Sequence, residues 1–113
     1  MIHLLSEPAT TEQMQEMLNE YGDMIKIVVD IRRGMLAGGA EMHYECEEVL
    51  LEQGSEQDDL WGANWYPARR QTEFESLINI RPRLNNRSML IQSPEIREKV
   101  ESITLRLLGG ILP

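Results

Sequence analysis

The sequence predicts an α+β domain, in which an antiparallel sheet of about four to five strands packs against helices in the order α-β-β-α-β-β-α. Three observations support this fold class. Apolar residues recur at helical spacing near both ends of the chain, a β-branched run follows the first of these stretches, and Gly and Pro residues separate the segments between them. Because no repeat or linker is visible in 113 residues, we expect a single domain, 1–113.

The first helix is predicted to begin after Thr10, since Thr10 and Gln13 have the spacing of a capping box. Gly22 is expected to end it after about three turns. The apolar residues between them recur on one helical face and are Met14, Met17, Leu18 and Tyr21.

Two antiparallel strands are predicted next. Residues 24–31 are rich in β-branched side chains, and Gly34 supplies a turn before residues 35–37. The pair at 38–39, both glycine, permits a bulge or a sharp bend, after which residues 40–43 either extend the second strand or follow it.

A short helix is favoured over residues 45–53. Cys46, Val49 and Leu50 have helical spacing, the carboxylates near its start suit a helix dipole, and Gly54 follows its end.

The second half of the chain is read as a hairpin followed by a helix. Residues 60–66 form a strand that Pro67 stops, residues 68–71 form the connecting loop, and residues 72–80 form the partner strand. Pro82 then breaks the pairing. Ser93 and Pro94 have the pattern of a helix start, and the apolar stripe of that helix is Ile96, Val100, Ile103, Leu107 and Leu108.

Charge is distributed unevenly along the chain. The net charge is -8, with 14 acidic against three basic residues in 1–68 and eight basic against five acidic residues in 69–113. A pI near 4.7 disfavours nucleic acid as a partner, because affinity for phosphate backbones comes largely from clustered cations. A local arginine site for one anionic group remains compatible with this balance.

Such a site is expected in the loop that follows the second hairpin. Arg81, Arg83 and Arg87 lie within seven residues of one another, interleaved with amide side chains that include Asn79 and Asn86. A planar guanidinium binds carboxylate or phosphate in a two-pronged fashion. The alternative is that these arginines pair with carboxylates of the first half of the chain and hold the loop in place.

Two tryptophans form a second candidate feature. On a strand, Trp61 and Trp65 project to the same face. Buried in the core, they would only stabilise the fold, whereas an exposed pair near the arginines would suit stacking on a ligand.

A third, weaker candidate is His43. On a strand, Glu41 and Glu45 would flank it, and a histidine next to carboxylates can act as a general base. Asp30 lies within an apolar strand and needs a partner if it is buried. No HxxxH or HExxH spacing is present, so no metal and no cofactor is expected.

The cellular setting is inferred from what the sequence lacks. The N-terminus has no basic flank or long apolar region typical of a secretory signal, and no apolar run is long enough to span a bilayer. Cys46 is a lone cysteine, which agrees with a reducing cytoplasm. We therefore expect a cytoplasmic protein with no membrane contact, and leave homo-oligomer formation through a sheet edge or the Met-rich first helix open.

Several stretches together form a recognisable pattern: 27–31 with Gly34, 39–43, 48–52 with Gly54 and Ser55, 60–67, 78–82, 86–89 and 94–99. In these stretches the chain resembles a small family of bacterial and archaeal proteins, including cyanobacterial ones, that is catalogued only as a domain of unknown function. The resemblance covers about Asp23 to Leu108 and implies a free-standing domain, without an activity or a catalytic residue.

Two functional hypotheses follow from these residues. The first is a binding or interaction protein that recognises an anionic ligand or an acidic partner through the arginine, asparagine and tryptophan residues named above. The alternative is a small hydrolase- or lyase-like enzyme that uses His43 with carboxylates.

Overall fold

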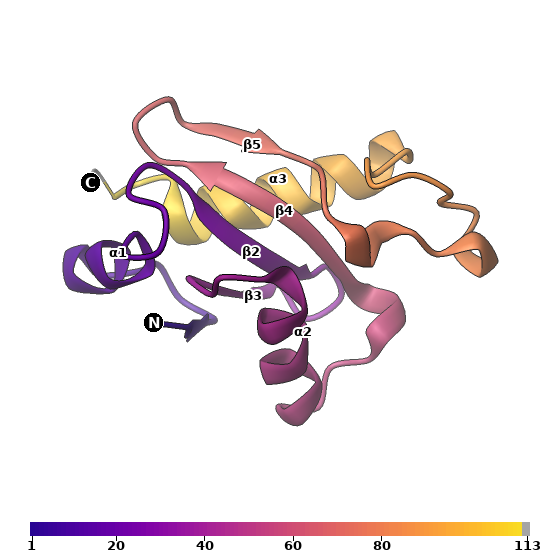
Figure 1. The fold of residues 1–113 in the computed structure, drawn as a ribbon, viewed down its shortest axis with the longest axis horizontal. Coiled ribbons are helices and arrows are strands. Elements are labelled where there is room, and N and C mark those ends of the chain that lie inside the picture. The colour runs from indigo at the N-terminus through magenta and orange to yellow at the C-terminus, as the bar shows by residue number, and fades with distance from the viewer. Residues whose placement is uncertain (112–113) are drawn as a thin grey trace.

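The computed structural model describes residues 1–111 and has the predicted α+β architecture: one five-stranded antiparallel sheet with helices on both faces (Figure 1). The strand order is β1-β3-β2-β4-β5, so the long strands β2 and β4 lie at the centre. The strands are β1 (His3–Leu5), β2 (Ile25–Asp30), β3 (Met35–Gly38), β4 (Leu60–Tyr66) and β5 (Gln71–Glu73), the α-helices are α1 (Thr11–Met17), α2 (His43–Glu52) and α3 (Pro94–Leu108), and three short 3-10 turns are η1 (Gln57–Asp59), η2 (Leu77–Asn79) and η3 (Pro82–Leu84).

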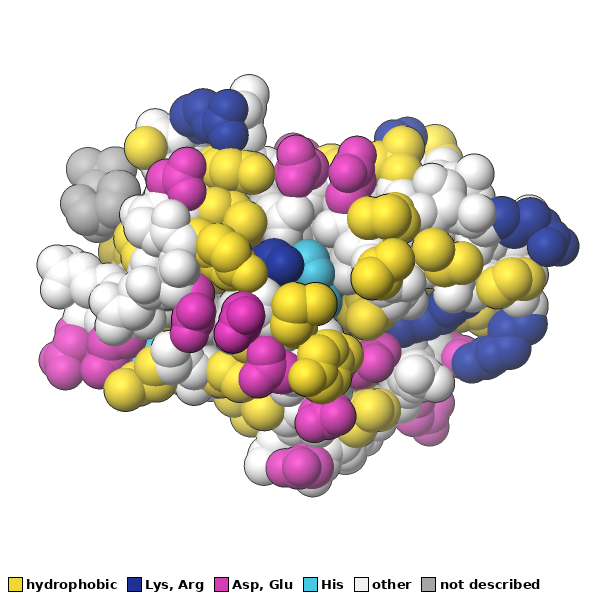
Figure 2. All heavy atoms as spheres, in the orientation of Figure 1, with side chains coloured by type: hydrophobic (Ala, Val, Ile, Leu, Met, Phe, Trp, Pro, Cys, Tyr) yellow, Lys and Arg dark blue, Asp and Glu magenta, His cyan; other side chains and the backbone are white. Residues whose placement is uncertain are grey.

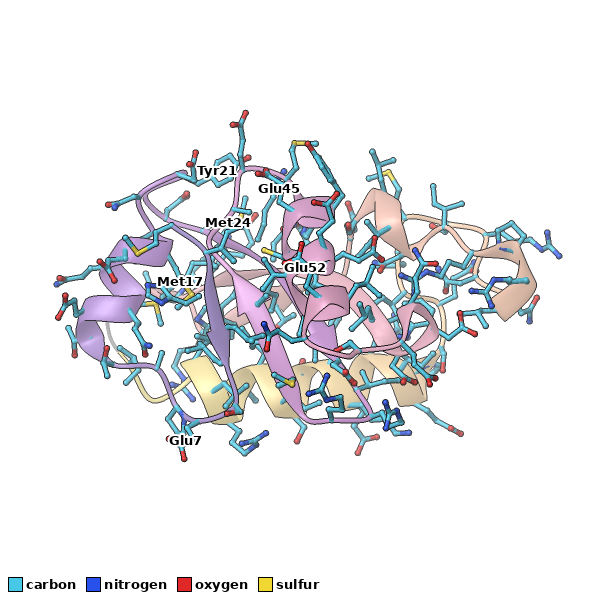
Figure 3. All side chains as sticks on the ribbon, turned by 90° about the horizontal axis from the view of Figure 1, so that it is seen from below. Glu7, Met17, Tyr21, Met24, Glu45 and Glu52 are labelled. Atoms are coloured by element: carbon cyan, nitrogen blue, oxygen red, sulfur yellow. The ribbon has the colours of Figure 1, made fainter. Side chains whose placement is uncertain are left out.

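The sheet separates two apolar clusters. Figure 3 shows α3 along one side of the sheet and α2 on the other. Because successive strand residues point to opposite faces, Ile27 and Val29 of β2 pack with α1 and α3, whereas Val28 packs with Cys46 and Leu50 of α2. The α3 side holds the larger cluster, and α2 covers only part of the opposite face.

Several local predictions are confirmed. Thr10 and Gln13 form the capping box at the start of α1. Ser93 caps α3, with Pro94 in its first turn. The strand predicted over 60–66 has those bounds as β4.

The structure differs from the predicted elements at β1 and over 72–80, and it decides between the two alternatives for residues 40–43. β1 was not foreseen, because three residues are too short for a periodic pattern. Residues 40–43 do not extend β3, since α2 begins at His43 with Glu45 capping it from within the first turn. The strand expected over 72–80 is confined to β5, after which the chain leaves the sheet and turns through η2.

The shortness of β5 has a physical cause at Gly62. Where β5 would continue beside Gly62 of β4, the Asn79 carboxamide makes the hydrogen bonds instead. Its Oδ1 accepts from the Gly62 N–H at 2.8 Å, and its Nδ2 donates to the Gly62 carbonyl at 3.0 Å. Ser76 lies so close that a Cβ on Gly62 would stand 2.5 Å from the Ser76 Cβ. The backbone of β4 is thus satisfied by a side chain where a strand was expected.

Candidate functional site

Polar side chains form a row across the sheet on the α2 face. In the strand register Lys26 of β2 lies opposite Asn64 of β4, and Asn64 lies opposite Glu73 of β5. The Asn64 Nδ2 donates to the Glu73 Oε1 at 2.9 Å. We call Lys26, Asn64 and Glu73 the polar row; the same face of the sheet also carries the buried apolar residues Val28 of β2 and Leu60 of β4.

A cavity with a volume of about 380 Å³ lies over this row, between α2 and the segment 75–90. A size of a few hundred Å³ is typical of small-molecule sites. Figure 2 shows this face, where a histidine and a basic side chain adjoin near the centre and hydrophobic side chains surround them. Besides the polar row, the polar lining comes from His43, Glu75 and Ser76, and the apolar lining from Met42, Tyr44, Leu77, Ile78 and Met89.

Lys26 supplies the positive charge of this cavity, which we call the row cavity. Its side chain is partly buried, and its ammonium forms no ion pair with any carboxylate of residues 1–111. The ammonium lies 5.2 Å from the centroid of the Tyr21 ring, and Tyr21 and Glu45 point to the same side of the molecule (Figure 3). A partly desolvated cation without a carboxylate partner retains its capacity for an anionic ligand.

His43 lies at the start of α2 with 9% of its surface exposed. Its Nε2 lies 2.8 Å from the Ala63 carbonyl oxygen. Because a carbonyl only accepts, this contact assigns the ring proton to Nε2 and leaves a lone pair on Nδ1 when the ring is neutral. Burial lowers the pKa of His43, the hydrogen bond to Ala63 opposes this, the nearby charge of Lys26 lowers the pKa further, and the Asn64 side chain raises it.

Protonation of His43 should therefore destabilise the fold. Since its folded pKa lies below the unfolded value of about 6.5, the unfolded chain takes up the proton first, so stability falls as the pH drops below about 6.5 and stops falling below the folded pKa. In His43→Gln, whose amide can still donate to Ala63, this part of the pH dependence should disappear. Urea unfolding of both proteins between pH 7.5 and pH 5, roughly the histidine range, measures it; parallel pH profiles would contradict the assignment.

Asn64 adds a buried acceptor to the row cavity. Asn64 is 7% exposed, and its side-chain Oδ1 has no hydrogen-bond partner among the described residues. Buried polar atoms in native proteins nearly always have a partner. An unsatisfied acceptor in a cavity lining is what a bound donor group would explain.

Two of the three predicted arginines are engaged within the fold. Arg81 is 8% exposed and donates to the Glu47 carboxylate at 3.0 Å and to the Leu60 carbonyl oxygen. Arg83 pairs with the exposed Asp58 through both terminal nitrogens. They line a second cavity, which shares only Leu77 and Ile78 with the row cavity.

Arg87 differs from the other two. It is exposed, and within residues 1–111 its guanidinium makes neither a hydrogen bond nor an ion pair, although its main-chain N–H donates to the Gln92 side chain at 2.9 Å. It does not line either cavity described above. Its unused donors face solvent.

The two predicted asparagines hold the loop together. Asn79 is fully buried and, besides its two contacts with Gly62, donates to the Met89 carbonyl at 3.0 Å. The Asn86 Nδ2 donates to the carbonyls of Asn79, Ser88 and Leu90. With their hydrogen-bonding groups used in this way, both carboxamides serve the fold.

The tryptophans are core residues. Trp61 and Trp65 are 2% and 1% exposed and belong to the apolar cluster on the α3 side. This is the face opposite to the row cavity, so neither indole is available for stacking on a ligand there. Their indole nitrogens have no hydrogen-bond partner among the described residues.

The carboxylates that were expected beside His43, those of Glu41 and Glu45, do not line the row cavity. Glu45 accepts from the Met42 main-chain N–H, and Glu41 is exposed outside the row cavity, its main-chain oxygen accepting from the Tyr21 hydroxyl. Asp30, at the end of β2, is fully buried. The acidic residues that share the row cavity with His43 are Glu73 and Glu75, which sequence reasoning missed.

Asp30 stabilises the turn between β2 and β3. Its Oδ1 accepts from the main-chain N–H groups of Arg32 and Arg33, and its Oδ2 accepts from the Ser55 hydroxyl at 2.6 Å. Asp30→Ala is therefore expected to cost about 3 kcal/mol of stability, because it leaves the buried Ser55 hydroxyl and two partly buried main-chain N–H groups unpaired. Asp30→Asn keeps an acceptor for both amides and should cost clearly less. Chemical denaturation distinguishes them, and equal losses would mean that the turn amides do not depend on this side chain.

One feature of the sequence pointed to the missed residues. Lys26 and Asn64 are polar residues within the strands 25–30 and 60–66, which are mostly apolar. Their alignment depends on the pairing register of three strands, which a single sequence does not give.

Neither a metal-binding cluster nor a membrane-spanning helix is found among the described residues. Within 1–111, no three His, Cys, Asp or Glu side chains are grouped closely enough to hold a metal ion. None of the helices over the same range has the length and apolar character needed to cross a membrane.

Comparison with known proteins identifies the family. No curated protein and no solved structure shows significant similarity to the chain. A family model described as "Protein of unknown function (DUF5674)" matches residues 3–107. Because this match covers nearly the whole chain, the protein belongs to the DUF5674 family.

Proposed function

We propose that the protein is a small-ligand-binding domain that recognises an anionic group through Lys26 in the row cavity. The observation that carries this proposal is that Lys26, a partly buried residue of the cavity lining, has no carboxylate partner for its ammonium within 1–111, although the chain has a net charge of -8. Acidic residues outnumber basic ones, so an unpaired cation inside a cavity is unexpected on structural grounds alone. The apolar lining would accept the remainder of the ligand.

The loop 81–87, which we call the arginine loop, contributes less to this proposal than its sequence indicates. Arg81 and Arg83 already bind Glu47 and Asp58, so an incoming anion would have to displace these carboxylates. Arg87 remains as a contact for an acidic partner protein on the outside of the loop. That contact would be additional to the ligand in the row cavity.

Binding of hexanoate, an anion with an apolar tail, tests the proposal. We expect saturable binding by calorimetry and, for Lys26→Gln, an affinity about tenfold lower, the range for a partly desolvated charge pair. Lys99→Gln is the matched control, because Lys99 is exposed on α3, behind the sheet. Equal affinities of the parent and Lys26→Gln, or no binding by the parent, would overturn the proposal; a loss in Arg87→Ala instead would place the anion at the loop.

A second function, proton-transfer catalysis, is favoured by one specific observation. His43 has its Nε2 proton committed to Ala63 and a pKa lowered by burial, so its Nδ1 lone pair is free at neutral pH. An enzyme of the hydrolase or lyase class would use this base, with Glu73 or Glu75 in the same cavity. Hydrolysis of anionic p-nitrophenyl esters with a rate that falls on acidification in the parent and is absent in His43→Gln would support it; equal rates in both proteins would contradict it.

A further inference from the structure

We infer that the ligand of the row cavity is a small zwitterion with apolar side chains, of the size of a dipeptide. This inference rests on the proposed function and names its ligand class. The polar row has opposite charges at its two ends, Lys26 on β2 and Glu73 on β5, with Asn64 between them. A ligand that matches both ends carries a carboxylate and an ammonium.

The separation of the two charges sets the length of the ligand. Lys26 and Glu73 stand two strand spacings apart, which is about 10 Å between their Cα atoms. Long side chains shorten the gap that a ligand must span. The ammonium and carboxylate of a dipeptide are separated by a peptide unit and suit such a gap better than those of a single amino acid, which share one carbon.

The acidic end of the row cavity is suited to an ammonium. Glu73 and Glu75 are both exposed carboxylates in the cavity lining, and neither forms an ion pair with a cation of residues 1–111. Only one Glu73 oxygen is used by Asn64. Two carboxylates with free acceptor positions favour a cationic group at this end.

The middle of the row provides an acceptor for the ligand backbone. Asn64 lines the cavity, and its buried Oδ1 makes no hydrogen bond with the described residues, although the side chain lies close enough to the His43 ring to raise the pKa of His43. An oxygen acceptor between a cation and a carboxylate matches the N–H of a peptide bond. A simple fatty anion leaves this atom unsatisfied, whereas a dipeptide supplies its donor.

The apolar wall accounts for the side chains of the ligand. Met42, Tyr44, Leu77 and Met89 are exposed hydrophobic residues from two different segments that face one cavity. Methionine side chains adapt to ligands of different shape. Apolar side chains of a dipeptide would cover this surface.

Three related probes test the inference on the parent protein by calorimetry: leucyl-leucine, its N-acetyl form and its C-terminal amide. The free dipeptide should bind about tenfold more tightly than either blocked form, since each block removes one charge pair. If the N-acetyl form binds as well as the free dipeptide, the anion site stands and the zwitterion inference falls. If none of the three binds, the zwitterion inference fails, and the binding of hexanoate decides separately whether the anion site stands.

Variants of the polar row show which residues bind the carboxylate and which bind the ammonium of the ligand. Lys26→Gln should abolish the preference for the free carboxylate while keeping the preference for the free ammonium. The double variant Glu73→Gln, Glu75→Gln should do the reverse, and Lys99→Gln should match the parent. Loss of both preferences in either folded variant would contradict the proposed orientation, and the parent comparison above decides the inference if Lys26→Gln does not fold.

Discussion

Replacing Asn79 with alanine is expected to lower the free energy of unfolding by about 3 kcal/mol, because three hydrogen bonds of a fully buried side chain are lost and the Gly62 N–H and carbonyl are left without partners. Asn79→Asp should be at least as damaging, since a carboxylate has no donor for the two carbonyls that Asn79 contacts. Urea denaturation at neutral pH measures both effects.

Asn19→Ala is the matched control for this prediction. Asn19 is exposed, and its side chain makes no hydrogen bond within 1–111, so its loss should change stability by less than about 0.5 kcal/mol. If Asn79→Ala unfolded like the parent, the carboxamide would not be replacing a strand beside β4. Its assignment as a fold-determining residue would then be wrong.

Removing Glu47 is expected to be the second large change. Glu47→Ala leaves the Arg81 guanidinium, which is 8% exposed, without its carboxylate, and breaking one side of a buried pair costs about 3 kcal/mol or more. Burial already lowers the pKa of Arg81, and the hydrogen-bonded charge of Glu47 opposes that shift. The loss of stability should appear in denaturant midpoints.

The double variant Arg81→Met, Glu47→Met distinguishes the loss of the ion pair from the cost of burying one charge without its partner. Because both charges are removed together, it should recover a large part of the stability lost in Glu47→Ala. An Arg81→Ala protein that is as stable as the parent but binds hexanoate less tightly would contradict this account. Arg81 would then be a ligand contact, as its sequence context indicates.

The fold was predictable where a local pattern fixes it. Thr10 and Gln13 identify the start of α1, and Ser93 with Pro94 identifies the start of α3, because capping depends on residues a few positions apart. The strand predicted over 72–80 was wrong beyond Glu73. The segment has the alternation of side chains that is typical of a strand, but a side chain within it, that of Asn79, makes the hydrogen bonds to β4 in place of a strand backbone. That contact joins Asn79 to Gly62, residues 17 positions apart.

The candidate site was less predictable for the same reason. Clustering in sequence drew attention to Arg81, Arg83, Asn79 and Asn86, whose partners in the structure are other parts of the fold. The polar row brings together residues from three strands that are far apart in sequence, and no local pattern encodes their register. The sequence feature that indicates the polar row is the presence of Lys26 and Asn64 inside mostly apolar strands.

The central claim is that the ligand site lies over the polar row and not on the arginine loop. Two-dimensional amide NMR during a titration with leucyl-leucine tests it most directly, because each perturbed signal reports a position. We predict that the largest saturable shifts belong to the main-chain amides at His43 and Leu77 and to the Asn64 side-chain amide. Shifts confined to residues 81–87, with those three signals unmoved, would contradict the claim.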